Sequence, residues 1–131
     1  MNQKLTFFQR LHDRQDFESA LKNKAFIDKW LAVHWEKNSK GVDRLGIVLS
    51  KRTVKHAVAR NKIKRLIRET FRTNYCQKKV SYNIVIRLRK NVLAAESREF
   101  RRTISRLLTK VWMTENDSPI LIVHKGLSIS D

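Results

Sequence analysis

The sequence contains one cysteine, one proline and three glycines in 131 residues. Cys76 has no partner for an internal disulfide, which is typical of a protein kept in a reducing cytoplasm. The low content of proline and glycine excludes a linker-rich or low-complexity chain. With 41% hydrophobic residues, this length predicts a single domain around one core.

Long apolar runs are absent as well. The longest runs, residues 45–49 and 120–123, are far shorter than the roughly 20 residues that a membrane-spanning helix needs. The first eight residues lack the long apolar segment of a signal peptide, and no small-residue cleavage site follows them. We therefore expect a cytoplasmic protein without a membrane anchor.

Acidic residues are few, and they are scarcest in the middle of the chain. The sequence has 29 Lys+Arg and 12 Asp+Glu, which gives a net charge of +17. Residues 44–95 contain 15 Lys/Arg and one acid, Glu69, and carry +14 of this charge. A charge that served only solubility would be spread evenly and mixed with acids. The concentration indicates a polyanionic partner, either nucleic acid or an anionic membrane.

The spacing of apolar residues predicts three helices. The first begins after Asp13, the expected N-cap, and ends near Lys24. The second covers about residues 53–72, which contain no glycine or proline. The third covers residues 97–113, with Ser97 as its N-cap and a continuous apolar stripe along its length.

Strands are predicted between these helices. Residues 25–35 are rich in aromatic and branched side chains, with a break at residues 28–29, and a turn follows at residues 38–41. Residues 44–50 and 82–88 are predicted to form two further apolar strands, and the first is expected at the centre of the sheet, covered on both faces. The order α-β-β-β-α-β-α predicts an α+β or α/β sandwich in which helices pack on a small sheet.

The central helix has two chemically different sides, since successive residues are about 100° apart. The side expected to be buried carries Ala59, Ile63, Leu66, Ile67, Thr70 and Phe71. The opposite side carries Asn61, Arg65, Arg68 and Arg72, flanked by Lys62 and Lys64. Like charges four residues apart destabilise an isolated helix, so this side indicates external anions. Arginine can bind two phosphate oxygens at once, and Asn61 can contact a base edge or a sugar hydroxyl.

RNA is the favoured anion. A membrane-bound helix would turn its apolar side to lipid, whereas this side is expected to cover the sheet. No helix-turn-helix pattern or zinc-ligand spacing indicates DNA. The preceding loop, with Lys51 and Arg52, extends the basic surface away from the helix axis, and a broad surface suits a folded RNA.

Two segments resemble the signature of the bacterial ribonuclease P protein family: LGIVLSKR at residues 45–52 and AVARNKIKRLIRE at residues 57–69. Arg10-Leu11 and Asp16-Phe17 are similar to the opening helix of that family. The resemblance covers about residues 8–113, and we take residues 1–113 as one domain. It implies an α+β sandwich like domain 2 of ribosomal protein S5, with a left-handed crossover through the basic helix.

The resemblance also implies a division of labour. In that family a catalytic RNA subunit uses Mg²⁺ to remove the 5′ leader of precursor tRNA, and the protein binds that RNA and the leader. We then expect no catalytic or metal-binding residue in this chain, and neither a membrane nor DNA as its partner. By position, the RNA-binding residues are Lys51, Arg52, Arg60, Asn61, Lys62, Lys64, Arg65, Arg68 and Arg72. The leader cleft maps onto Phe17, Leu21, Leu31 and Val33.

Three departures from the family pattern bear on these assignments. Lys62 stands where arginine is common, which keeps the charge but loses the bidentate geometry. Leu21 and Val33 stand where aromatic residues are common, so base stacking rests on Phe17, for which a core position is an equal alternative. Residues 114–131 extend beyond the usual end of the last helix, and we assign them no role.

The residues themselves predict no protein active site. Glu69 offsets neighbouring arginines, and the paired acids Asp13 and Asp16 suit helix capping. The histidines lack the spacing of metal ligands; they are His12, His34, His56 and His124. The main alternative to a ribonuclease P subunit is a non-catalytic RNA-binding or ribosome-associated module with an S5-like fold, and a DNA-binding protein is a third.

Overall fold

The computed structural model describes residues 10–23, 25–74 and 80–115. Its elements are α1 (Arg14–Leu21), β1 (Ala25–Ile27), β2 (Leu31–Asn38), β3 (Arg44–Val48), α2 (Ala57–Asn74), β4 (Ser81–Leu88), the short 3-10 helix η2 (Ala94–Glu96) and α3 (Ser97–Glu115). The predicted order α-β-β-β-α-β-α is confirmed.

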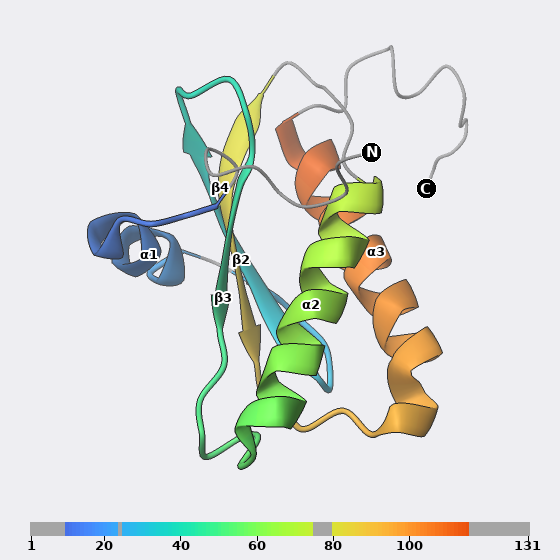
Figure 1. The fold of residues 1–131 in the computed structure, drawn as a ribbon. Coiled ribbons are helices and arrows are strands. Elements are labelled where there is room, and N and C mark those ends of the chain that lie inside the picture. Colours follow the sequence, from blue (N-terminus) through green and yellow to red (C-terminus); the bar gives the residue numbers. More distant parts are fainter. Residues whose placement is uncertain (1–9, 24, 75–79, 116–131) are drawn as a thin grey trace, which may run out of the picture.

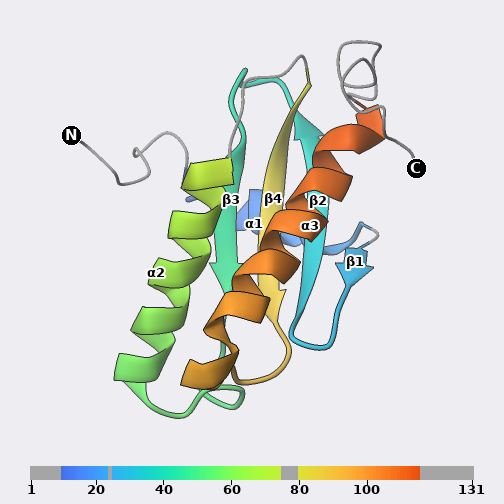
Figure 2. The same ribbon diagram turned by 90° about the vertical axis from the view of Figure 1, so that its right-hand side faces the viewer.

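The four strands form one mixed sheet in the order β1-β2-β4-β3. β3 is therefore an edge strand, and its predicted central position is wrong: its apolar run arises because helices cover both of its faces. β2 is antiparallel to β1 and to β4, whereas β3 and β4 are parallel. α1 covers one face of the sheet, and α2 and α3 lie side by side on the other (Figures 1 and 2). The fold is therefore α+β, with the sheet between two helical layers.

The connection between the parallel strands is unusual in its handedness. In Figure 2, β3 and β4 both run downward, β4 lies to the right of β3, and α2 lies in front of them. This is a left-handed crossover, against the strong general preference for right-handed ones. It brings the basic helix to the β3 edge of the sheet instead of its centre.

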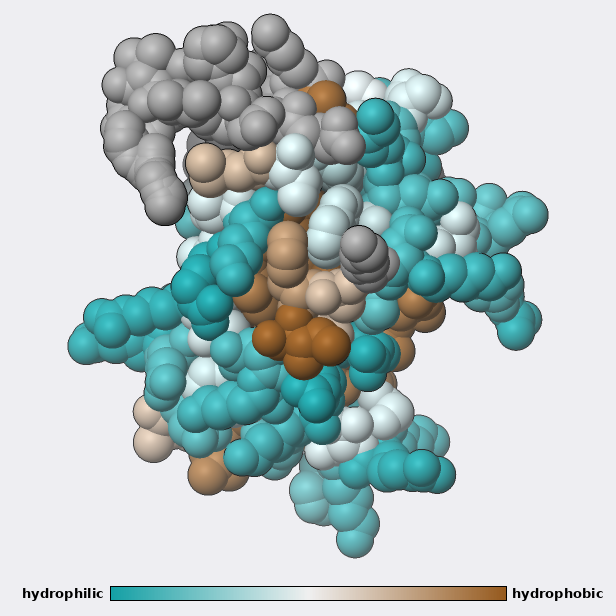
Figure 3. Space-filling model, turned by 180° about the vertical axis from the view of Figure 1, so that it is seen from behind, coloured by the Kyte–Doolittle hydropathy of each residue, from teal (hydrophilic) through white to brown (hydrophobic). Residues whose placement is uncertain are grey.

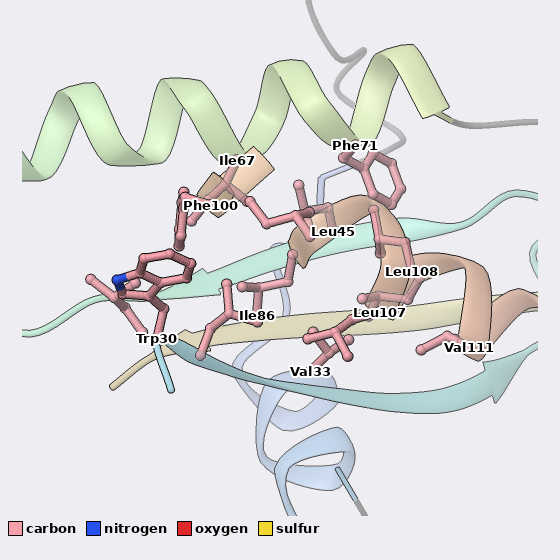
Figure 4. Packing of buried hydrophobic residues seen from close by; sticks show 14 of the residues in the cluster. Trp30, Val33, Leu45, Ile67, Phe71, Ile86, Phe100, Leu107, Leu108 and Val111 are labelled. Carbon is pink, nitrogen blue, oxygen red and sulfur yellow. The ribbon is translucent and has the colours of Figure 1, made fainter. Parts of the chain in front are cut away.

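The main core lies between the sheet and the helices α2 and α3. Alternate residues of β2 and β4 point into it, among them Leu31, Val33 and Ile86, because successive strand residues face opposite sides. Trp30 packs edge-to-face against Phe100, with ring centroids 5.6 Å apart. Figure 4 shows how these side chains interlock with those of the two helices.

Asp13 caps α1 as predicted, since its side chain accepts from the backbone N–H of Gln15 at 2.9 Å. The predicted N-cap of α3 is wrong. Ser97 is already helical, with φ −62° and ψ −35°, because the chain enters α3 from η2. There the Glu96 carboxylate accepts from the N–H of Leu93 at 2.9 Å.

The boundaries of all three helices also differ from prediction. α1 ends at Leu21 and not near residue 24. α2 begins at Ala57 and not at Thr53, whose N–H bonds to Ser50 in a turn. α3 continues to Glu115, two residues past its predicted end at residue 113. The predicted extension from residue 116 onward lies outside the described residues.

The sheet edge formed by β1 is short and carries exposed apolar surface. Ile27 is 61% exposed at this edge. Seen from behind, a compact apolar patch lies between hydrophilic side chains on both flanks of the molecule (Figure 3).

Candidate nucleic-acid interface

The predicted sidedness of α2 is confirmed. Its apolar side packs on the sheet, and Ile63, Ile67, Thr70 and Phe71 are buried. Ala59 and Leu66 are partly buried against the same core. The apolar side is therefore occupied within the protein, and the basic side is turned to solvent.

The basic side does not present its residues equally. Asn61, Lys62 and Arg65 are exposed, and Lys64 and Arg68 are partly buried on the flank next to β3. Arg65 makes no ion pair with any other described residue. The loop before α2 adds the exposed residues Lys51 and Arg52 to the same end of the molecule.

Two of the predicted RNA-binding arginines have partners within the protein. The guanidinium of Arg60 donates to the carbonyl oxygens of Val54 and Lys55, at 2.9 and 2.8 Å. Arg72 donates to the carboxylate of Glu69 at 2.6 Å. The Arg60 contacts hold the loop before α2, a role that residue spacing does not reveal. The Arg72–Glu69 pair confirms that Glu69 offsets a neighbouring arginine.

A basic groove, which we call the β3-edge groove, lies where α2, β3 and the segment before α1 meet. Its volume is about 220 Å³. It is lined by Arg10, Leu11, His12, Phe17, Leu45, Gly46, Ile47, Lys64 and Arg68. Three of these side chains are cations, and none is acidic. Burial, and secondarily the charge of Arg10, lowers the pKa of Arg68, so an anion in this groove would relieve repulsion among its cations.

The segment before α1 is held to the sheet edge by backbone pairing. Arg10 forms a parallel bridge with Leu45, and the N–H of Leu11 donates to the Leu45 carbonyl at 2.9 Å. This pairing places Arg10 beside α2. The sequence analysis assigned no RNA contact to Arg10, because its proximity to α2 arises only from the tertiary fold.

Phe17 lies between the core and the surface. Its ring lies so close to the Gly46 backbone that a Cβ at that position would overlap Cε1 and Cζ. It also packs against the small cluster formed by Leu11, Ala20 and Val85. The partly buried ring is thus both a packing residue and part of the wall of the β3-edge groove.

The structure does not bring together the four residues predicted for the leader cleft. Phe17 and Leu21 lie on the α1 side of the sheet. Leu31 and Val33 are fully buried in the core on the opposite side, beneath α2 and α3. Their assignment to a cleft beside α1 is wrong, because the strand alternation directs them away from that helix.

His34 lies on the α1 side of the sheet and is nearly buried, at 7% exposure. Its Nδ1 is 3.2 Å from the carbonyl oxygen of Asn23, and its Nε2 has no hydrogen-bond partner among the described residues. Burial lowers the pKa of His34, the Asn23 contact raises it, and the charge of Arg87 lowers it further. We interpret His34 as a packed neutral side chain.

Two kinds of site are absent from the described residues. No three or more His, Cys, Asp or Glu side chains there gather closely enough to hold a metal ion. Within the same residues, no helix combines the length and the apolar character needed to cross a bilayer.

Comparisons with known proteins agree on one family. The sequence profile described as Ribonuclease P matches residues 5–112. The ribonuclease P protein component of Clostridioides difficile (strain 630) is 34% identical over 97 residues, which are 72% of this chain and 84% of that protein. That of Clostridium kluyveri is 34% identical over 104 residues, which are 77% of this chain and 92% of that protein.

Solved structures give the same result. The RNase P protein from Thermotoga maritima, in complex with 1-(4-fluorophenyl)-2-thiourea, superposes with a TM-score of 0.59 and 33% identity, covering 78% of this chain and 95% of that one. The Staphylococcus aureus RNase P protein superposes with a TM-score of 0.60 and 26% identity, covering 82% and 94%. The chain is thus similar to these proteins over nearly the whole described fold.

Proposed function

The chain belongs to the bacterial ribonuclease P protein family and is a subunit of the ribonucleoprotein endoribonuclease that matures the 5′ ends of tRNA, and we propose that it acts by binding the catalytic RNA through α2 and the precursor leader beside α1. The observation that carries this proposal is the β3-edge groove. There Phe17 of α1 lines the same depression as Lys64 and Arg68 of α2. One nucleotide strand can then contact an aromatic ring and two cations at once.

For α2 we propose direct contacts to the RNA subunit from the exposed side chains of Asn61, Lys62 and Arg65, continued by Lys51 and Arg52 in the loop. These contacts would be made mainly to phosphates, which position a protein without reading sequence. Arg60 would support RNA binding indirectly, since its guanidinium donates hydrogen bonds to the loop carbonyls of Val54 and Lys55.

For the leader we propose a path through the β3-edge groove. Phe17 offers an aromatic ring, and Arg10, Lys64 and Arg68 offer positive charge around it. A single-stranded leader supplies unstacked bases and phosphates, which match such a groove. Leu21 would support Phe17 from within the α1 packing, and Leu31 and Val33 have no part in this path.

Hydrolysis is assigned to the RNA subunit in this proposal. Mg²⁺ would be held by the RNA, and the protein would bind and position the substrate. In this proposal the S5-like sandwich supplies a sheet that separates the two RNA-facing helices, α1 and α2. We also propose a cytoplasmic location, in keeping with a single cysteine.

The test is reconstitution of the holoenzyme. The full chain is added to a bacterial ribonuclease P RNA at low Mg²⁺, and cleavage of precursor tRNA is followed with time. We expect cleavage that the RNA alone does not support at that Mg²⁺ concentration. Tight RNA binding without stimulation would instead favour a non-catalytic RNA-binding module.

Phe17→Ala sharpens this test for the leader. We expect weaker binding of precursor tRNA and little change for mature tRNA, because only the precursor carries a leader. Equal losses for both substrates would place the effect of Phe17 in the packing of α1 and contradict a leader contact.

A further inference from the structure

A second groove lies on the other flank of α2, between the N-terminal halves of α2 and α3; we call it the α2/α3 groove. Its volume is about 370 Å³. Its lining is Ala59, Lys62, Ile63, Leu66, Val92, Leu93, Ala94, Ser97 and Phe100. Only Lys62 and Ser97 carry polar side chains, so the floor of this groove is apolar, unlike that of the β3-edge groove.

Apolar side chains are exposed to water at this end of the molecule. Leu93 in the groove wall is 61% exposed, and Val58, one helical turn before Lys62, is 68% exposed. With Ile27 at the β1 edge, they are the exposed large hydrophobic side chains of the described residues. Apolar surface gathered in a concave site is typical of a binding surface.

Positively charged side chains lie on both sides of the groove, which we call its α2 bank and its α3 bank. Lys62 lies on the α2 bank, and Arg98 and Arg101 are exposed on α3 next to the lining residues Ser97 and Phe100. Neither arginine makes an ion pair with another described residue. By contrast, Arg106, farther along α3, forms an ion pair with Asp28 at 3.0 Å.

The backbone adds to this positive potential. α2 and α3 run in the same direction, and both begin at the end of the molecule where the groove lies (Figure 2). The N-terminal ends of helices carry partial positive charge. The groove thus combines an apolar floor, three cationic side chains and two helix starts.

We propose that the α2/α3 groove binds an unpaired nucleobase of RNA, with the flanking phosphates on Lys62, Arg98 and Arg101. The inference rests on the proposed function and extends its RNA surface from α2 onto α3. A single nucleotide joins an apolar base face to an anionic phosphate, which matches the apolar floor and cationic banks together. An apolar protein segment would match the floor alone.

The first test fills the groove. Ala94 and the neighbouring Ala95 are both exposed, but only Ala94 lines the groove, so Ala94→Phe and Ala95→Phe form a matched pair. The affinity of the full chain is measured for an oligouridylate of about ten nucleotides and for its abasic counterpart. We expect Ala94→Phe to lower the preference for the base-containing strand about fivefold, and Ala95→Phe to leave it unchanged. Equal behaviour of the two variants, with unchanged thermal unfolding, would overturn the proposal.

The second test removes the cations of the α3 bank. Arg98→Gln with Arg101→Gln is compared with Arg106→Gln and Lys110→Gln, which remove the same charge from the side of α3 that carries contacts to Asp28 and Phe26. We expect the first pair alone to reduce the slope of log affinity against log salt, by about 0.7 for each lost single-strand phosphate contact. Equal slopes would mean that α3 does not contact RNA.

Reconstituted cleavage separates the two proposals. If the wild-type chain stimulates a ribonuclease P RNA, and the variants at Ala94, Arg98 and Arg101 bind as their controls do, the proposed function stands and the inference fails. If the wild-type chain does not stimulate cleavage while the groove variants still lose base preference, the proposed function fails and the groove remains an RNA site.

Discussion

The indole Nε1 of Trp112 donates a hydrogen bond of 2.6 Å to the carboxylate of Asp43, 69 residues away in the sequence. Both residues are buried, with exposures of 6% and 0%. The second oxygen of Asp43 accepts from the backbone N–H of Tyr82 at 2.8 Å. One carboxylate thus joins the turn after β2, the start of β4 and the last turns of α3.

Asp43→Ala should lower the free energy of unfolding by about 3 kcal/mol, because two buried donors lose their acceptor. Trp112→Phe should lower the free energy of unfolding by about 1–2 kcal/mol, since it leaves one buried oxygen of Asp43 without this hydrogen-bond donor. Urea unfolding followed by circular dichroism measures both. As a control, Asp28→Ala breaks the more exposed pair with Arg106 and should cost less than about 1 kcal/mol. A similar cost at Asp43 and Asp28 would contradict the anchoring role.

Gly46→Ala should destabilise the protein by about 1–3 kcal/mol, because the new methyl group overlaps the ring of Phe17. The same substitution in a Phe17→Ala background should cost much less, since the ring is gone. Urea unfolding of the four proteins in this double-mutant cycle measures the coupling. Equal costs in the two backgrounds would show that the ring does not rest on Gly46.

The sequence was sufficient to predict the order of elements and the two sides of α2. A helix with one apolar side and one basic side has a period that survives in the sequence, and residues such as Ile63 and Arg65 could be assigned from it. The N-cap Asp13 was equally local, because capping depends on neighbouring residues only.

The faces of β2 could not be predicted in the same way. Helices cover both sides of the sheet, so the four consecutive residues from Leu31 to His34 are all buried. His34 is the one polar residue of this stretch and is itself buried, so no residue there marks a solvent face, and a shift of one residue reverses every side chain. The pattern of β2 therefore gave no warning that the resemblance had assigned Leu31 and Val33 to the wrong side of the sheet.

The β3-edge groove was also beyond local reasoning. Arg10 meets Lys64 and Arg68 because residue 10 pairs with β3 and because the crossover is left-handed. Neither feature follows from residue spacing. The Asp43–Trp112 bond likewise joins residues whose proximity depends on the complete fold.

Acidification should destabilise the protein through His34. Burial holds the pKa of His34 below its value in an unfolded chain, about 6.5. The folded state therefore binds this proton more weakly than the unfolded state. The stability contributed by His34 is complete above about pH 6.5 and is lost as pH falls from there through the folded pKa. Urea unfolding at intervals between about pH 5 and 7.5 should show this loss, and His34→Gln should reduce it. The exposed His56 provides the control: if His56→Gln reduces the loss as much as His34→Gln does, the assignment to His34 is wrong.

Arg60 and Arg65 should behave differently although they lie on the same basic helix. Arg60→Ala removes the donors to the Val54 and Lys55 carbonyls and should cost about 1–3 kcal/mol of unfolding free energy. Arg65→Ala, at an exposed position, should change it by less than about 0.5 kcal/mol. Thermal and urea unfolding distinguish them, and equal losses would mean that the two loop contacts do not stabilise the fold.

Arg65→Ala combined with Arg68→Ala should weaken binding of the ribonuclease P RNA and flatten its dependence on salt. Each lost phosphate contact lowers the slope of log affinity against log salt by roughly 0.7 to 0.9, because fewer counterions are released on binding. The measurement is a titration of labelled RNA at several salt concentrations. Arg106→Ala with Lys110→Ala removes the same charge from α3 and should lower affinity at low salt by long-range attraction alone. An unchanged slope in the α2 variant would mean that RNA does not contact this helix. Equally lowered slopes in both variants would mean that the basic side of α2 attracts RNA only through long-range electrostatics.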